Sequence, residues 1–559
     1  MKAGAGLGDF GMTFSGVLRR PAGLAWKKRQ QALSFTHKSG DRGCTLLAVA
    51  IFVRVSNPPR RPVRATRSSA AANAQWAHNE LGSIQLGDLR SNRRMVQAFS
   101  QMLNAPGASI PQCSSSPAEA KAFYRLLDVE ALTDTLLFEV QREAVLRRAR
   151  ASGCRVMLAI QDTTTCNFDT HHSLEGLGAI SCNGRKSGIQ GLHVHSTLLS
   201  AADEDAVFGL LGARLYAREV SRKKQAPGTR NRERIEDKES VRWLESLALA
   251  REASRCLQQA SAERQADAAA PPESPLIVSV GDREADIYEL LLEARQHRDQ
   301  NLGLLVRAQH NRTLAGEEAQ LWQHLASSPR AGSLTLQLPR GQGQKARQAT
   351  LDVRFESVTL AVPAHKAKYL KMDTPVKVSV VELREEGGGA GKGICWRLLS
   401  TLSVDTLEGA LQMARWYAKR WQIEEFHRIL KTGCRVEARQ MRSLERLKPM
   451  MALDMMVACR IMGMSAAARQ DPQGPASDWL DEDEISALEA YENAGGNRVA
   501  EAPGIMRVGE AVRRIGRLGG HLGRKGDGHP GAQVLWQGLA KLDIITEVWR
   551  RLRHPPSCG

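Results

Sequence analysis

The sequence contains no pair of cysteines at the C-x-x-C spacing of a zinc site or a redox motif. Its ten cysteines are scattered, so we expect reduced, mostly buried thiols in a cytoplasmic protein. The apolar run Leu46–Val53 is only about eight residues long, whereas a membrane-spanning helix needs about 20. It also starts too far along the chain for an ordinary signal peptide. These absences predict a soluble protein with no membrane partner.

Acidic residues are scarce at the start of the chain, and this changes the meaning of the total charge. The formal net charge is +18 and the pI is about 9.7, which favours an anionic partner such as nucleic acid. However, residues 1–75 contain thirteen Lys and Arg but only two acids, Asp9 and Asp41, so they hold +11 of this charge. The remaining 484 residues hold only +7. Their charge alone is therefore weak evidence for DNA binding.

Residues 1–73 are rich in Gly, Arg and Ser and show little hydrophobic periodicity. This composition is typical of a disordered extension. Two other interpretations remain open, namely a basic arm that touches DNA and upstream sequence translated from a misplaced start.

Helical patterns begin after this extension, in a chain whose 559 residues are enough for two to four domains. Asp88–Leu103 and Ser116–Leu127 have helical periodicity, and Pro117 stands at the first position of the second helix. The basic residues interleaved among the apolar ones are Arg90, Arg93, Arg94, Lys121 and Arg125. A helical domain that lies on DNA phosphates fits this pattern, and so does a helical domain with a solvated face.

Two aspartates each follow a short apolar segment with the pattern of a buried strand. Val156–Ile160 leads to Asp162, and Leu276–Val280 leads to Asp282. We expect the sheet to present both carboxylates at its edge, where they suit a hard cation such as Mg²⁺. Residues 320–404 alternate with a period of two and predict a β-rich insertion.

A single long helix, Thr406–Lys431, is expected to supply a third carboxylate. At 100° per residue, one face about 60° wide contains Tyr417, Arg420, Glu424 and Lys431. A separate apolar stripe, suited to packing on the sheet, contains Trp416, Ile423 and Leu430. Carboxylates that hold metal ions beside cations that grip a phosphate are what phosphodiester chemistry requires. A solvated helix face with i,i+4 ion pairs gives the same spacing.

These residues also resemble the motifs of a known family. Tyr417-x2-Arg420-x3-Glu424-x6-Lys431 resembles the Y-R-E-K signature of the insertion-sequence-four family of DNA transposases. The segments GDREADI at 281–287 and IQDTTT at 160–165 resemble that family's second and first aspartate motifs. The likeness runs over roughly residues 76–550 in the family's order and is greatest to the transposase of transposon five. Three spaced motifs together are far more specific than any one alone.

The resemblance implies an α/β fold, with a ribonuclease-H-like catalytic domain that carries a β-rich insertion and is flanked by helical N- and C-terminal domains. The implied divisions are a basic, disordered extension (1–73), a helical DNA-binding domain (74–145), a catalytic domain (146–442, with the insertion at about 312–404) and a helical dimerisation domain (443–559). The resemblance also implies two Mg²⁺ ions, for which Mn²⁺ could substitute. Asp162 would bridge them, and Asp282 and Glu424 would each complete one site.

Contacts to DNA follow from the same resemblance. Tyr417, Arg420 and Lys431 would hold the phosphate of the strand left behind, and Arg307 would contact DNA near the metal ions. Trp396 matches a tryptophan of the insertion on which family members stack a base that is flipped out of the duplex. An ordinary core aromatic is the alternative interpretation of Trp396.

A cut-and-paste DNA transposase is the function that the resemblance implies. Such an enzyme cleaves the element ends through a hairpin intermediate and joins them to target DNA. Its partners would be double-stranded DNA, as terminal inverted repeats and target, and a second copy of the chain in the synaptic complex. We expect it in the bacterial cytoplasm, associated with the nucleoid when bound to DNA.

Three alternative functions remain. The first two are a metal-dependent nuclease without strand transfer and a non-catalytic, transposase-derived DNA-binding regulator. The third is a glycosidase built on Asp282 and Glu424, which would have no use for Arg420 or Lys431.

Several other polar residues fit structural roles better. His193 and His195 share one face of a predicted strand, but no third metal ligand is evident beside them. Glu425 points away from the face of Glu424. We assign the remaining acids of the second motif, Glu284 and Asp286, to a helix start.

Overall fold

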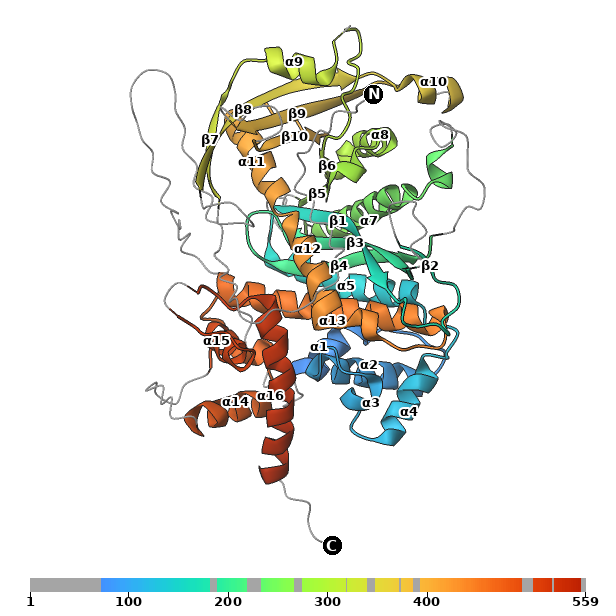
Figure 1. The fold of residues 1–559 in the computed structure, drawn as a ribbon, viewed down its shortest axis with the longest axis vertical. Helices are drawn as coiled ribbons and strands as arrows, with labels where there is room; N and C mark the ends of the chain where they lie inside the picture. Colours follow the sequence, from blue (N-terminus) through green and yellow to red (C-terminus); the bar gives the residue numbers. More distant parts are fainter. Residues whose placement is uncertain are drawn as a thin grey trace, which may run out of the picture.

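The computed structural model is shown in Figure 1. The residues that it describes are 72–180, 189–218, 233–265, 274–317, 319–338, 347–370, 374–385, 393–494, 506–524 and 527–553. The prediction for residues 1–73 therefore lies outside the described residues, except for Ala72 and Asn73, which open the first helix.

The chain begins with a group of helices: α1 (Ala72–Leu81), α2 (Leu89–Asn104), α3 (Ile110–Cys113), α4 (Pro117–Leu126) and α5 (Asp134–Ser152). The two helices predicted here are confirmed, and their starts have a local cause. Asp88 caps α2 by accepting hydrogen bonds from the amides of Arg90 and Ser91. Ser116 caps α4 through the amide of Glu119. Such caps satisfy amides that a helix start otherwise leaves unpaired.

A ten-stranded mixed sheet dominates the described part of the chain, in the order β2-β3-β1-β5-β6-β10-β9-β8-β7. The tenth strand, β4, pairs with β3 on the side opposite β1. The strands are β1 (Val156–Asn167), β2 (Gly178–Ala179), β3 (Gln190–Ala201), β4 (Val207–Tyr216), β5 (Leu276–Gly281), β6 (Leu302–Arg307), β7 (Gly332–Leu338), β8 (Arg347–Leu360), β9 (Val376–Glu385) and β10 (Cys395–Ser400). β1, β5 and β6 run parallel. The strands predicted between 320 and 404 continue this sheet because β10 pairs with β6.

Helices cover both faces of the sheet. On one face α7 (Val241–Gln265), α8 (Tyr288–Gln296) and part of α5 enclose a core around Trp243 and Leu291. On the other, α11 (Leu407–Ala418) and α12 (Trp421–Arg428) cross the sheet from the β8–β10 end towards α13 (Leu444–Gln470), as Figure 1 shows. α13 has the length and hydropathy of a membrane span, but 89% of its apolar window is buried inside the protein. Core helices meet the same criteria.

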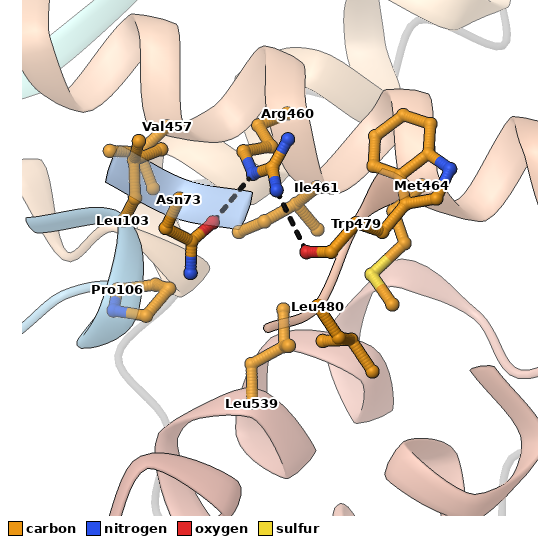
Figure 2. Close-up of a pocket in the computed structure, with 10 residues that line it drawn as sticks. All are labelled: Asn73, Leu103, Pro106, Val457, Arg460, Ile461, Met464, Trp479, Leu480 and Leu539. Carbon is orange, nitrogen blue, oxygen red and sulfur yellow. Dashed lines mark hydrogen bonds between the residues drawn. The ribbon is translucent and has the colours of Figure 1, made fainter. Parts of the chain in front are cut away.

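The remaining helices lie at the two ends of the molecule (Figure 1). α9 (Leu321–Ser327) and α10 (Ala364–Leu370) accompany the outer strands, whereas α14 (Glu482–Ala494), α15 (Val508–Leu518) and α16 (Ala532–Arg553) follow α13. A small pocket lies where the N-terminal helices meet α13 and this C-terminal group (Figure 2). There the buried Arg460 donates hydrogen bonds to Asn73 Oδ1 (2.9 Å) and to the carbonyl of Trp479 (2.8 Å). This arginine therefore ties the first helix to the last third of the chain.

Three sequence predictions about local structure are wrong. The first strand does not end before Asp162, because β1 continues to Asn167 by pairing with β3 along its whole length. The helix expected from Glu284 begins only at Tyr288. Asp286 turns inward there, where it pairs with Arg312 (2.5 Å) and accepts two backbone amides. That arrangement is incompatible with a regular first turn.

The third error concerns the helix predicted over Thr406–Lys431. It tightens between α11 and α12, where the amide of Arg420 bonds to the carbonyl of Tyr417, three residues back (3.0 Å). Lys419 is held at this point by the carbonyls of Ala201 and Glu204, in the turn between β3 and β4. The helix then widens into a π-helical turn at Ile429–Gly433. The predicted apolar stripe is nevertheless buried: Trp416, Ile423 and Leu430.

Candidate active site

Asp162 lies on β1, and Asp282 directly follows the neighbouring parallel strand β5. Because Ile160 pairs with Val280 in the β1–β5 register, Asp162 and Asp282 stand two residues beyond the same pair. A backbone amide holds each carboxylate: Thr163 N donates to Asp162 Oδ1 (2.7 Å), and Glu284 N donates to Asp282 Oδ1 (2.8 Å). Burial and the negative charge of Asp282 raise the pKa of Asp162 to about 7. The ionised form of Asp162 is thus disfavoured, first by burial and then by the second carboxylate nearby.

The tightened helix brings Arg420 and Glu424 to the aspartates. Arg420 Nη1 lies 3.1 Å from Asp162 Oδ2, and the other arm of the same guanidinium pairs with Glu424. The Arg420 side chain is 17% exposed, and those of Asp162 and Glu424 are 20% and 34% exposed. One cation therefore bridges a carboxylate of the sheet and a carboxylate of the facing helix.

Three further predicted residues gather next to this bridge. The Trp396 ring packs edge-on against Tyr417, with the ring centroids 5.4 Å apart. Arg307, opposite Leu398 in the β6–β10 pairing, donates to the carbonyl of Cys395 (3.2 Å). Burial raises the pKa of Tyr417, while the charges of Arg420 and Arg307 lower it and that of Asp282 raises it. The phenol thus lies within electrostatic reach of both cations and one acid.

Lys431 is the predicted residue that stands apart. It lies in the π-helical turn, and among the described residues it forms no ion pair with any of the three acids. Its charge acts instead on His427 and on Cys166, which is on β1 four residues beyond Asp162. The prediction of a shared helix face is therefore confirmed for Arg420 and Glu424, which form an i,i+4 pair. It does not lead to an ion pair between Lys431 and the acids in the described residues.

The acidic residues have the donor atoms that a magnesium site requires, but their present spacing does not yet suit an ion. In the described ranges, no three His, Cys, Asp or Glu side chains are already arranged to hold an ion, since Arg420 lies between Asp162 and Glu424. The donors themselves are carboxylate oxygens, which Mg²⁺ and Mn²⁺ prefer. Burial, and then the charge of Asp282, raise the pKa of Asp162, so a cation beside this carboxylate would favour its ionised form. The residues present therefore fit a divalent ion.

Sequence reasoning missed one prominent side chain, that of Trp421. It follows Arg420 directly and is 62% exposed, which is unusual for a tryptophan. On a helical wheel Trp421 falls about 40° from Tyr417, at the edge of the face already singled out. The wheel could therefore have identified it.

The other polar residues considered have structural partners. His195 hydrogen-bonds to Thr163 and Gln161, and His193 stacks on Tyr216 with ring centroids 5.2 Å apart. Glu425 pairs with Arg428 (3.2 Å).

Three segments of the chain match known protein families. Residues 73–132 match a transposase DNA-binding family, residues 284–459 the transposase DDE domain, and residues 456–558 the transposase Tn5 dimerisation domain. The DDE match includes Glu424, whereas Asp162 and Asp282 precede it. The chain thus contains the catalytic domain of an enzyme of the DDE transposase class. With all three domains in this order, the chain is a member of the Tn5-like transposases.

Proposed function

We propose that this transposase acts by cut-and-paste, cleaving element ends through a hairpin intermediate and joining them to target DNA with two divalent ions. The observation that carries the proposal is the bridge of Arg420 between Asp162 and Glu424, with Asp282 alongside. It brings a cation suited to binding phosphate into contact with two oxygen-donor acids, beside a third. Double-stranded DNA, as terminal inverted repeats and as target, is the proposed substrate, which would place the enzyme at the bacterial nucleoid.

The strand order supports a ribonuclease-H-like catalytic domain. β4, β3 and β1 are antiparallel, and β5 and β6 then follow parallel to β1. We assign β7–β10 to the β-rich insertion. The acids at the centre of this sheet and on the crossing helix then have the arrangement that this class of domain uses.

Each residue of the site has a distinct proposed role. Divalent ions, when bound, supply activation of the attacking hydroxyl and stabilisation of the leaving oxygen. Asp162 would hold both ions, and Asp282 and Glu424 one each. Once cations neutralise the carboxylates, the Arg420 guanidinium can turn to a DNA phosphate in the bidentate geometry that suits it. Tyr417 would donate its hydroxyl to the same phosphate.

Aromatic side chains at the site fit an unpaired base. The Trp396 ring packs against Tyr417, and the exposed Trp421 directly follows Arg420 in the chain. Stacking on such rings tolerates any base because each base has a π-face. We assign Trp396 and Trp421 to holding the strand open while the hairpin forms, and Arg307 and Lys431 to the flanking phosphates.

A homodimer is the proposed assembly in the synaptic complex. Helix α16, inside the matched dimerisation segment, exposes an apolar stripe at i, i+4 and i+8: Ile544 (66% exposed), Val548 (52%) and Leu552 (75%). We propose that a second copy covers this stripe, because exposed apolar surface of this kind marks an interface.

Excision and joining in cells test the proposed function. A marker would be placed between a pair of inverted repeats identified in the DNA around the gene, and joined products would be amplified and sequenced. We expect Asp162→Ala to abolish both cleavage and joining while the protein still binds the repeats in a mobility-shift assay. Glu425→Gln serves as the matched control, since Glu425 pairs with Arg428 on the same helix.

Each alternative function predicts a different outcome. A nuclease without strand transfer would give cleaved ends and no joined product. A non-catalytic regulator would keep its whole activity after Asp162→Ala. Either result would overturn the cut-and-paste proposal.

A further inference from the structure

Behind the two aspartates runs a chain of hydrogen bonds that the proposed chemistry does not use. Arg242 Nε donates to Thr163 Oγ1 (3.0 Å), which contacts His195 Nδ1 (2.8 Å). His195 Nε2 contacts Gln161 Oε1 (3.2 Å), and Gln161 Nε2 donates to Ser279 Oγ (2.7 Å). The chain thus joins α7, β1, β3 and β5 just beneath the acidic edge of the sheet.

All the bonds in this chain can run in one direction. Because Arg242 can only donate, the Thr163 hydroxyl is free to donate its own hydrogen to His195 Nδ1. His195 then donates from Nε2 to Gln161 and must be neutral. Burial first, and then the positive charges of Arg242 and Arg214, lower the pKa of His195 well below its usual range. The neutral histidine that the bonding requires is therefore also the favoured form.

Arg242 connects this network of hydrogen bonds to the residues next to both aspartates. Its three guanidinium nitrogens bind different partners: Nε the Thr163 hydroxyl, Nη1 the carbonyl of Glu239 (2.8 Å), and Nη2 the Glu284 carboxylate (2.8 Å). Thr163 and Glu284 are the residues whose amides hold Asp162 and Asp282. A single planar cation therefore spans the two amide donors of the metal-binding edge.

We propose that Arg242 is a positioning residue that sets the separation of Asp162 and Asp282 and thereby the affinity of the site for divalent ions. The inference rests on the proposed metal-dependent function and deepens it. Partners that orient metal ligands typically change metal affinity by about 10- to 100-fold when they are removed. A planar fork with fixed nitrogens suits this role, whereas a lysine would offer one point charge.

The surroundings of Arg242 favour this role over DNA contact. Its side chain is 10% exposed and lies over the Trp243 ring, 5.8 Å from the centroid. The Glu284 side chain is 63% exposed, so the ion pair by itself contributes little to stability. The bonds of Arg242 to Thr163 and to the Glu239 carbonyl are better protected and fix the guanidinium plane. Arg242 thus acts on the aspartates through Thr163 and Glu284, from the interior of the protein.

Binding of Mn²⁺ to the full chain tests the proposal without measuring turnover. Free Mn²⁺ would be followed by electron paramagnetic resonance as metal is added to wild type and to Arg242→Met. We expect Arg242→Met to weaken Mn²⁺ binding at least about tenfold. The matched control is Arg251→Met, because Arg251 lies on the same helix and pairs with a glutamate of the next segment, Glu293 (2.9 Å). That variant should bind Mn²⁺ like wild type.

A second pair of variants separates positioning from folding. Thr163→Val removes the hydroxyl that links Arg242 to His195, and Thr163→Ser retains it. We expect Thr163→Val to weaken Mn²⁺ binding and Thr163→Ser to restore it, with all variants compared by circular dichroism. If wild type bound no Mn²⁺, the proposed metal-dependent function itself would fail. If wild type bound Mn²⁺ but Arg242→Met and Thr163→Val bound it equally well, only the positioning role would be overturned.

Discussion

Arg420 has two sets of partners that cannot be satisfied together. Its guanidinium now bridges Asp162 and Glu424, but both carboxylates are proposed metal ligands and Arg420 is proposed to bind a phosphate. Without metal, the arginine offsets repulsion that would otherwise separate the acids. Under the proposal, divalent ions would take over that role when they bind, and the arginine would become available to DNA. Metal binding and phosphate binding are then coupled through one side chain.

This coupling predicts how Arg420→Gln affects stability. Without metal, the variant leaves two part-buried carboxylates unneutralised and should lower the free energy of unfolding by about 1–3 kcal/mol. Mn²⁺ should remove most of that deficit. Thermal unfolding with and without Mn²⁺ measures both effects. Arg428→Gln, which breaks the Arg428–Glu425 pair on the same helix, is the control. A deficit in Arg420→Gln that does not change with metal would contradict the coupling.

Glu484 predicts a pH dependence at the start of α14. Its carboxylate accepts from Asp481 N (2.8 Å), and its amide donates to Asp481 Oδ1 (2.7 Å). Burial and the charge of Asp481 raise the pKa of Glu484 to about 8, despite the nearby Arg460 and Arg550. In the unfolded chain the carboxyl ionises near pH 4.5. The folded state therefore loses stability as the pH rises from about 4.5 to 8.

Glu484→Gln should remove this loss, since glutamine still accepts the Asp481 amide but cannot ionise. Relative to wild type, we expect the variant to gain at least about 1 kcal/mol between pH 4.5 and pH 8, with no further gain above. Melting temperatures over this range provide the measurement. An equal difference at both pH values would refute the assignment.

At the scale of elements, α11, α12 and the π-helical turn together form the proposed catalytic helix, Leu407–Gly433. This helix departs from regular geometry at two points. It tightens at Lys419–Arg420 and widens at Ile429–Gly433. π-helical turns of this kind are frequent at functional sites. The first departure directs Arg420 and Glu424 to the sheet, and the second separates Lys431 from them.

Helix α16 predicts how the chain self-associates. Replacing Ile544 and Val548 together by Glu should weaken dimer formation on element-end DNA at least about tenfold, because charge would be buried in the proposed apolar contact. Leu522→Glu adds charge at another exposed leucine (63%) of the matched dimerisation segment and should have no effect. Analytical ultracentrifugation of the DNA complexes distinguishes these outcomes. Undiminished association of the double variant would place the interface elsewhere.

At the scale of the whole molecule, the π-helical turn is where the three matched segments meet. A Cβ added at Gly107, in the DNA-binding segment, would collide with the carbonyl oxygen of Gly433 in this turn. A Cβ added at Gly433 would lie 3.1 Å from Trp536 of α16. The end of the catalytic helix is thus enclosed by the DNA-binding and dimerisation segments.

Gly107→Ala tests this junction. Both Gly107 and Gly87 have positive φ, +78° and +92°, but a Cβ at Gly87 meets nothing within 4 Å. The backbone cost is therefore common to both variants, and the collision belongs to Gly107→Ala alone. We expect Gly107→Ala to be less stable than Gly87→Ala by about 1–3 kcal/mol, measured by chemical denaturation. Equal losses would mean that the junction yields without cost.

The sequence by itself determined the choice of candidate acids, the helix starts at Asp88 and Ser116, and the buried stripe of the catalytic helix. These features depend on local periodicity and capping, which act between residues close in the chain. The family assignment likewise depends on motifs that remain legible without coordinates. The same helical wheel could have identified Trp421.

Only the tertiary structure decided how these parts meet. β1 extends past Asp162 because β3 lies beside it, and the helix tightens at Arg420 because Lys419 is anchored in a distant turn. Nothing local to Arg242 indicated that it would span the neighbours of both aspartates. Such features depend on partners far away in the sequence, whose pairing is settled only when the sheet and its covering helices pack together.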